Sequence, residues 1–180
     1  MPKNSITQIQ QDEKKILEEL SKNANKSINE IANKLGFSRQ KVWRAIKNLE
    51  EDKTIWGYTA IIDDNKIGRK KFCILLKKAP VKISDEDLNI VINRDLRETA
   101  SKNGVNIEST YFFHGLYDGQ ICVTAENIMQ VKKFIAEMQK KLGEHYIKET
   151  NILEVLVPIQ MRGFNNPNLT KLKGYFALDH

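Results

Sequence analysis

The stretch Phe37–Asp63, which reads FSRQKVWRAIKNLEEDKTIWGYTAIID, begins with a short helix whose two sides differ in chemistry. At about 3.6 residues per turn, Val42, Ile46 and Leu49 fall on one side, which predicts an apolar stripe packed on a core. The other side carries Gln40, Trp43, Arg44 and Lys47, with Arg39 at its border. A solvated face usually mixes acidic and basic residues at i, i+4 spacing. This side has no acidic residue before position 50, so it predicts contact with a negatively charged partner.

Two further helices are expected before this one. Residues 8–23 show an apolar side, and Ser27 is placed to cap a second helix together with Glu30 as a capping box. Gly36 suits the left-handed end of that helix, and Ser38 caps the next helix only two residues later. Such a tight turn predicts a helix-turn-helix, whose last helix is free to enter a DNA groove.

After the third helix the apolar pattern changes to a period of two. Residues 54–63, TIWGYTAIID, predict a short hairpin, or wing, that runs on as a strand. The polar stretch 63–70 follows as a connector. A basic run crosses this connector and is either a solvated linker or a set of phosphate contacts: Lys66, Arg69, Lys70 and Lys71.

The remainder predicts strand, helix (residues 85–102), strand, strand, helix, strand, which is the ferredoxin-like βαββαβ order of an α+β protein. One face of such a sheet is left without helices, and an open apolar face predicts pairing with a second copy. The expected organisation is a winged helix-turn-helix DNA-binding domain (1–62), a linker (63–70), a ferredoxin-like effector and oligomerisation domain (71–160) and a C-terminal extension (161–180).

Composition sets broad limits on function. The 180 residues carry a net charge of +6 and are 41% hydrophobic, which allows a packed core and mildly favours an anionic partner. The chain begins without a signal-peptide pattern, and no apolar run approaches the roughly 20 residues that span a bilayer. We therefore expect a cytoplasmic protein that does not bind membranes.

The chemically reactive residues are few. Cys73 and Cys122 lie far apart in the sequence within apolar runs, which predicts buried free thiols in a reducing compartment. His114, His145 and His180 are scattered, so neither a metal site nor a cofactor is expected. No catalytic pairing of Ser, His, Cys or Asp and no glycine-rich phosphate loop is apparent, so the sequence predicts a protein that is not an enzyme.

Two stretches, residues 12–63 and 114–135, resemble the Lrp/AsnC family of feast/famine transcriptional regulators, and the resemblance extends over about residues 8–160. It implies sequence-specific binding to double-stranded DNA by a homodimer, with assembly up to octamers. The turn of Gly115, Leu116, Tyr117 and Asp118 matches the family's Gly-x-Tyr/Phe-Asp turn. The resemblance implies that this turn lines a pocket for an amino-acid effector, formed here by Gly115, Tyr117, Asp118 and Gly119.

The chemistry of the third helix suggests separate roles for its residues. The expected DNA-binding set is Ser38, Arg39, Gln40, Trp43, Arg44 and Lys47. Arg44 suits guanine and Gln40 suits adenine, each through two hydrogen bonds in the major groove. Lys47 and Ser38 suit phosphates, while Trp43 either touches a thymine methyl or sugar or packs on the wing.

Other interpretations remain open at this point. The siroheme decarboxylases resemble the same family, and this chain has His114 but lacks their Tyr-Asn-x-Trp pattern. A non-specific architectural DNA binder and a protein-interaction module would also use an exposed third helix. The residues around Asp118 are also typical of a tight turn that binds no ligand.

Overall fold

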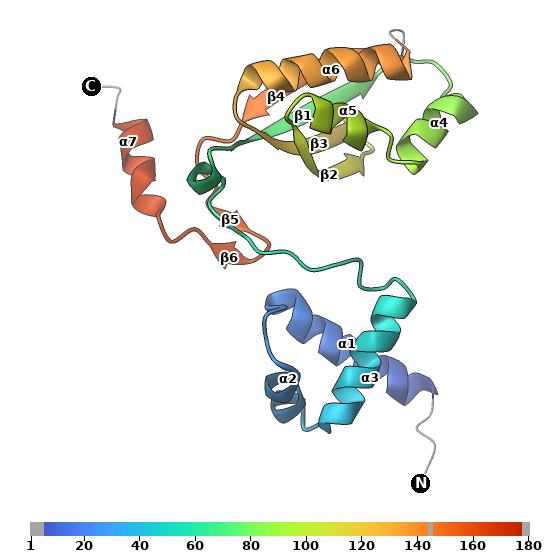
Figure 1. Ribbon diagram of the computed structural model, residues 1–180, viewed down its shortest axis with the longest axis vertical. Helices are drawn as coiled ribbons and strands as arrows, with labels where there is room; N and C mark the ends of the chain where they lie inside the picture. Colours follow the sequence, from blue (N-terminus) through green and yellow to red (C-terminus); the bar gives the residue numbers. More distant parts are fainter. Residues whose placement is uncertain (1–5, 144–145, 178–180) are drawn as a thin grey trace. The chain divides into compact units, whose positions relative to one another are not determined.

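The computed structural model describes residues 6–143 and 146–177, which fall into two compact units divided between Ile61 and Ile62 (Figure 1). The division lies one residue before the boundary expected from the sequence. His145 and His180 lie outside the described residues.

The first unit is built from three helices that all pack on one another: α1 (Ile6–Lys22), α2 (Ile28–Leu35) and α3 (Arg39–Glu51). The capping box of α2 is confirmed, since Glu30 N donates to Ser27 Oγ at 3.2 Å and Ser27 N donates to Glu30 Oε2 at 2.8 Å. Gly36 ends α2 with a φ of 66°, in the left-handed region that glycine adopts at little cost. Ile16, Ile31 and Val42 are buried between the helices, so the predicted apolar stripes form the core.

The expected hairpin after α3 is not formed. Residues 52–63 contain no strand, although Ile55 N donates to Leu49 O at 2.8 Å and keeps the chain close to the helix end. A strand needs a partner that completes its hydrogen bonds, and the described chain supplies none to this segment. Trp56, Tyr58 and Ile62 therefore stay exposed to solvent, and Trp56 is 95% exposed.

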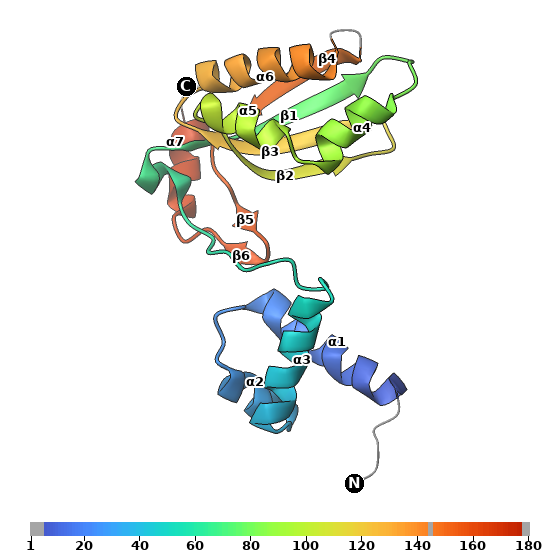
Figure 2. The same ribbon diagram turned by 45° about the vertical axis from the view of Figure 1, so that its right-hand side comes forward.

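The second unit is a four-stranded antiparallel sheet with helices on one face (Figures 1 and 2). Its elements are β1 (Lys70–Lys78), α4 (Asp85–Ile92), α5 (Leu96–Lys102), β2 (Asn106–Phe112), β3 (Gly119–Ala125), α6 (Ile128–Leu142) and β4 (Ile147–Glu154). The strand order β2-β3-β1-β4 confirms the ferredoxin-like prediction. Phe72, Ile121 and Phe134 are buried where α6 covers the sheet.

None of the described helices lies on the opposite face of this sheet, which we call the open face. Alternation along β1 places Cys73 and Leu75 there, because Phe72 and Ile74 point to the core on the other face. Beside Cys73 lie Cys122 of β3 and Leu153 of β4, as the strand pairing shows. Both cysteines are free thiols, as predicted, but they are only partly buried in one chain.

The helix expected over 85–102 is broken into α4 and α5. Asn93 caps the end of α4, and Arg94 has a φ of 61°, which a continuous right-handed helix cannot contain. The apolar side expected from the spacing, with Leu88 and Ile92, is wrong for α4: both residues are exposed, whereas Ile90 and Leu96 pack on the core. The left-handed residue between the two helices could not be read from that spacing.

The basic run of the connector is used partly within the second unit. A 3₁₀ turn, η1 (Asp64–Ile67), precedes β1. Arg69 donates to Gly104 O at 2.9 Å and to Thr124 O at 2.6 Å. Lys71 pairs with Glu108 at 2.8 Å and Asp64 at 3.4 Å. For Arg69 and Lys71, the interpretation as a solvated linker is therefore wrong.

The last strand ends at Glu154 rather than near residue 160, and the C-terminal extension has its own short elements. These are β5 (Gln160–Met161), β6 (Phe164–Asn165), the 3₁₀ turn η2 (Leu169–Lys171) and α7 (Leu172–Phe176). Arg162 and Gly163 form the tight turn between β5 and β6 with φ values of 47° and 86°. No helix among the described residues has the length and apolar character to cross a membrane.

Candidate nucleic-acid interface

Helix α3 is oriented by its cap and its buried side. Ser38 begins the helix as N-cap, and its hydroxyl oxygen accepts from Lys41 N at 3.3 Å. Val42 is fully buried and Leu49 is 4% exposed, so the apolar stripe faces the core. The opposite side of α3 is consequently turned to solvent.

That solvent side is the basic face of α3, defined by the exposed residues Arg39, Gln40, Trp43, Arg44 and Lys47. Trp43 keeps 51% of its surface exposed, which is unusual for so large an apolar ring. Lys47 Nζ lies 5.4 Å from the centre of the Trp43 ring, within reach of a cation–π contact. The structure thus brings together all the helical residues that the sequence assigned to DNA.

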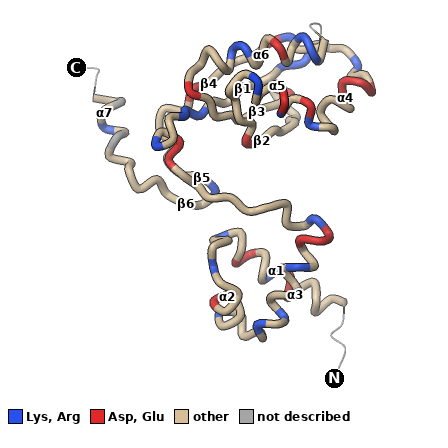
Figure 3. The backbone as a smooth tube through the Cα atoms, in the orientation of Figure 1, with Lys and Arg blue, Asp and Glu red and all other residues tan. Residues whose placement is uncertain are grey.

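Acidic residues gather only at the C-terminal end of α3, as Figure 3 shows. Glu51 lies 3.7 Å from Lys47, a weak exposed pair. Glu50 accepts a hydrogen bond from the Tyr58 hydroxyl at 2.8 Å, which holds it toward the segment after the helix. The first three turns of the basic face therefore remain positively charged.

An ion pair that the sequence reading missed ties α3 to α1. Lys41 forms an ion pair with Asp12, which is only 4% exposed. Lys41 Nζ also lies 4.1 Å from the centre of the Phe37 ring. The Lys41 ammonium lowers the pKa of Asp12 despite the opposing effect of burial. Asp12 and Ile16 share one side of α1 at i, i+4 spacing. A carboxylate on a core-facing stripe was the signal that could have revealed this pair.

A second buried carboxylate joins α1 to α2. Glu19, 4% exposed, accepts from Lys26 at 2.7 Å and pairs with Lys34 at 2.8 Å and Lys22 at 3.4 Å. Hydrogen bonds from Lys26 and Lys34 hold the pKa of Glu19 at about 2, below its ordinary value of 4.5. Ion pairs therefore stabilise the packing of α1 against α2, the two helices on which α3 packs, in addition to the apolar core.

This carboxylate predicts a pH-dependent stability of the first unit. A depressed pKa stabilises the fold above the unfolded value of about 4.5, and that contribution is lost as the pH falls toward 2. Glu19→Gln should therefore lower the free energy of unfolding at neutral pH, and its difference from the unmodified protein should vanish near pH 2. Both tryptophans lie in this unit, so denaturant titration followed by tryptophan fluorescence measures it. The exposed Glu18→Gln is the control, and an equal pH dependence in both variants would contradict the assignment.

The turn predicted to bind an effector is tightly braced within the second unit. Asp118 Oδ2 accepts from Lys78 N at 2.9 Å, and Asp118 N donates to Leu76 O at 2.9 Å. The other carboxylate oxygen of Asp118 accepts no hydrogen bond from the described residues. The Tyr117 hydroxyl accepts a hydrogen bond from Asn151 Nδ2 at 3.4 Å. Gly115 has free space on the side where a Cβ would stand. Part of the Asp118 carboxylate therefore positions the turn itself.

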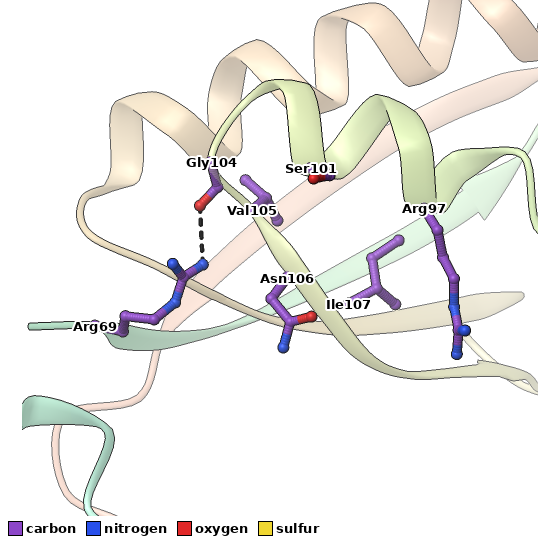
Figure 4. Close-up of a pocket in the computed structure, with 7 residues that line it drawn as sticks. All are labelled: Arg69, Arg97, Ser101, Gly104, Val105, Asn106 and Ile107. Atoms are coloured by element: carbon purple, nitrogen blue, oxygen red, sulfur yellow. Dashed lines mark hydrogen bonds between the residues drawn. The ribbon is translucent and has the colours of Figure 1, made fainter. Parts of the chain in front are cut away.

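A cavity of about 410 Å³ lies at the other end of β2 (Figure 4). Its lining residues are Arg69, Arg97, Ser101, Gly104, Val105, Asn106 and Ile107. The two guanidinium groups lie at opposite ends of it, and that of Arg69 is engaged by Gly104 O. The cavity therefore offers no convergent pair of arginines for an anion.

Comparisons with known proteins agree with this arrangement. The model of a winged helix-turn-helix DNA-binding family matches residues 13–55. An HTH-type transcriptional regulator from Methanocaldococcus jannaschii is 33% identical over 124 residues, covering 68% of this chain and 76% of that protein. The HTH-type transcriptional regulator LrpA from Pyrococcus horikoshii is 47% identical over 60 residues, covering 33% of this chain and 43% of LrpA.

Solved structures share the fold. An AsnC family transcriptional regulator from Agrobacterium tumefaciens has a TM-score of 0.59 at 22% identity, covering 89% of this chain and 97% of that one. A feast or famine regulatory protein from M. tuberculosis, complexed with L-methionine, has a TM-score of 0.64 at 16% identity, covering 85% and 95%.

A helix-turn-helix unit with an exposed basic helix, followed by a ferredoxin-like unit, defines a two-domain DNA-binding transcriptional regulator. The chain belongs to the Lrp/AsnC family of such regulators. The family resemblance and the fold class read from the sequence are both confirmed.

Proposed function

We propose that this regulator recognises a specific double-stranded DNA sequence through the basic face of α3. The observation that carries the proposal is the division of α3 into a buried apolar side and an exposed side rich in donors. Because the apolar side of α3 is packed on the core, the opposite side presents a fixed set of side chains to the major groove.

Within this face, side-chain chemistry separates reading from anchoring. Arg44 offers two parallel donors to guanine O6 and N7, and Gln40 offers a donor and an acceptor to adenine N6 and N7. Lys47, the Ser38 cap and Arg39 suit phosphate oxygens, which set position without reading sequence. Trp43, half-exposed beside Lys47, suits a thymine methyl or a sugar.

Lys47→Ala tests the anchoring role. The variant should bind all DNA sequences more weakly to a similar degree, and the slope of log K against log salt should fall in magnitude by about one. Fluorescence anisotropy at several salt concentrations, with specific and random duplexes, measures both quantities. Lys15→Ala, an exposed lysine on α1, is the control. A loss confined to one sequence would instead make Lys47 a reader.

The proposed DNA-binding species is a homodimer that covers the open face of the sheet. Tyr111 and Leu153 are 49% and 52% exposed in the second unit, and a second copy would bury such groups. A two-fold dimer would present two α3 helices to major grooves about 34 Å apart, which requires a near-palindromic operator. Further assembly, up to an octamer, is part of the proposal. Light scattering that shows only monomer over the working concentration range would contradict it.

An amino-acid effector is proposed at the turn of Gly115, Tyr117, Asp118 and Gly119. The support is the free carboxylate oxygen of Asp118, which suits an α-ammonium group, together with a structural relative that is complexed with L-methionine. Calorimetric titration with each of the twenty amino acids tests the proposal. Binding should be lost in Asp118→Asn at the ligand concentration that half-saturates the unmodified protein. If none of the twenty amino acids produces heat of binding, the effector proposal is wrong, whereas the proposal of DNA binding is not affected.

A further inference from the structure

The ion pair of Asp12 and Lys41 joins α1 to α3 and takes no part in the proposed DNA contacts. Lys41 is the third residue of α3, next to the buried Val42 and three positions before Arg44. Because residues three apart are neighbours on a helix surface, a rotation of α3 that separates Lys41 from Asp12 also displaces Arg44. The pair is therefore placed to act on the side chains that would meet base edges.

The Asp12 carboxylate is held in one position on α1. It lies one helical turn before Ile16, which is fully buried, and the Asp12 side chain is only 6% exposed. Gln8 Nε2 donates to Asp12 Oδ1 at 3.0 Å, whereas the Lys41 ammonium contacts Asp12 Oδ2. Both carboxylate oxygens are engaged, so α1 offers a fixed acceptor against which α3 can be oriented.

Lys41 is also held by several contacts. Its ammonium nitrogen lies 4.1 Å from the centre of the Phe37 ring, and its backbone N donates to the Ser38 hydroxyl at 3.3 Å. An ammonium that contacts both a buried carboxylate and an aromatic ring is not free to meet a phosphate. Lys41 thus differs from Lys47, which is exposed on the basic face of α3.

Apolar packing alone constrains the rotation of α3 weakly. Hydrophobic burial is non-directional, and the buried residues of α3 are Val42 near its start and Leu49 near its end. A charge-assisted contact has a preferred geometry and is therefore directional. The Asp12–Lys41 pair adds such a contact at the N-terminal end of α3, the end whose residues contact base edges in helix-turn-helix proteins.

We propose that Asp12 and Lys41 are positioning residues for sequence recognition. Their contact sets the rotation of α3 and, with it, the direction of the Arg44 and Gln40 side chains. The inference rests on the proposed function of α3 as a reader of DNA. It gives a carboxylate, whose charge DNA repels, a favourable effect on binding to the recognised sequence and none on binding to other sequences.

Asp12→Asn separates positioning from electrostatics. Removal of an acidic charge strengthens the attraction to any duplex, so binding to a scrambled duplex should stay equal or become tighter. Binding to the duplex enriched from a random pool should become weaker. The ratio of the two affinities should fall about tenfold, which is within the discrimination that one base contact supplies.

Fluorescence anisotropy with the two duplexes measures this ratio in the full chain. Glu18→Gln removes the same charge from an exposed position on α1 and should leave the ratio unchanged. Circular dichroism at the binding temperature checks that each variant is folded. A partly unfolded variant would lose affinity for both duplexes by the same factor, so the ratio is not affected by a loss of stability.

Lys41→Met and the double variant complete a double-mutant cycle. Methionine keeps an unbranched stem beside the Phe37 ring and removes the charge. Each single variant should lower the affinity ratio, and the double variant should lower it no further, because both substitutions break the same contact.

An unchanged ratio in Asp12→Asn, or losses that add up in the double variant, would overturn the inference and leave the proposed function intact. If the unmodified protein enriches no sequence from the random pool, the proposed function is wrong and the inference is wrong with it.

Discussion

Arg44→Ala is expected to weaken binding to the operator by about 1–3 kcal/mol, roughly 5- to 150-fold, and to relax selection at one base pair in each half-site. The reason is geometric: Arg44 is exposed on the side of α3 opposite the buried Val42, where a guanidinium can meet a base edge. Binding to random DNA should fall much less, because a lost base contact is not needed there.

Competition binding with an operator, a set of single-base variants and random duplex measures this effect. Arg97→Ala, an exposed arginine on α5, removes the same charge outside the DNA-binding unit and serves as the matched control. If Arg44→Ala lowers binding to operator and to random DNA by the same factor, Arg44 is a phosphate anchor and the assigned reading role is wrong.

Phe134→Ala is expected to destabilise the sheet unit by about 3–5 kcal/mol. Phe134 is fully buried where α6 meets the sheet, so its removal leaves a cavity and loses the burial of an aromatic ring. Hydrogen exchange of the β1 and β3 amides measures the loss. The exposed neighbour Lys133→Ala should change stability by no more than about 0.5 kcal/mol.

The same variant tests whether the two units fold on separate cores. Both tryptophans, Trp43 and Trp56, lie in the first unit, so their fluorescence reports on that unit. The midpoint of that transition should not change in Phe134→Ala. A parallel shift of both probes would show that the two units unfold together.

Local signals were sufficient for the DNA-binding unit. Ser27 with Glu30, Gly36 and Ser38 are capping residues, and their effect depends on neighbours three or four positions away. The strand order of the second unit also followed from the order of its elements, because the ferredoxin-like layout admits few connections. Exposure of Arg44 and Trp43 followed from the helical period alone.

The features that were missed all depend on partners distant in the sequence or on backbone angles. Residues 54–63 have strand-forming side chains but no described partner strand, so the expected hairpin did not form. Arg94 interrupts the expected helix because its backbone is left-handed, and arginine as a residue type does not predict that conformation. Arg69 and Lys71 were interpreted as charges of a linker, but their acceptors, Thr124 and Glu108, lie on distant strands of the sheet. The Cys73–Cys122 pair required the register of β1 against β3.

Selection from a pool of random double-stranded DNA, sequenced after binding at two salt concentrations, tests sequence-specific recognition by α3 most directly. The predicted result is enrichment of a near-palindrome whose half-sites lie about one helical turn apart, retained at the higher salt, with selection at one base pair of each half-site relaxed in Arg44→Ala. Salt-sensitive binding with no enriched sequence would contradict the account and make the protein a non-specific DNA binder.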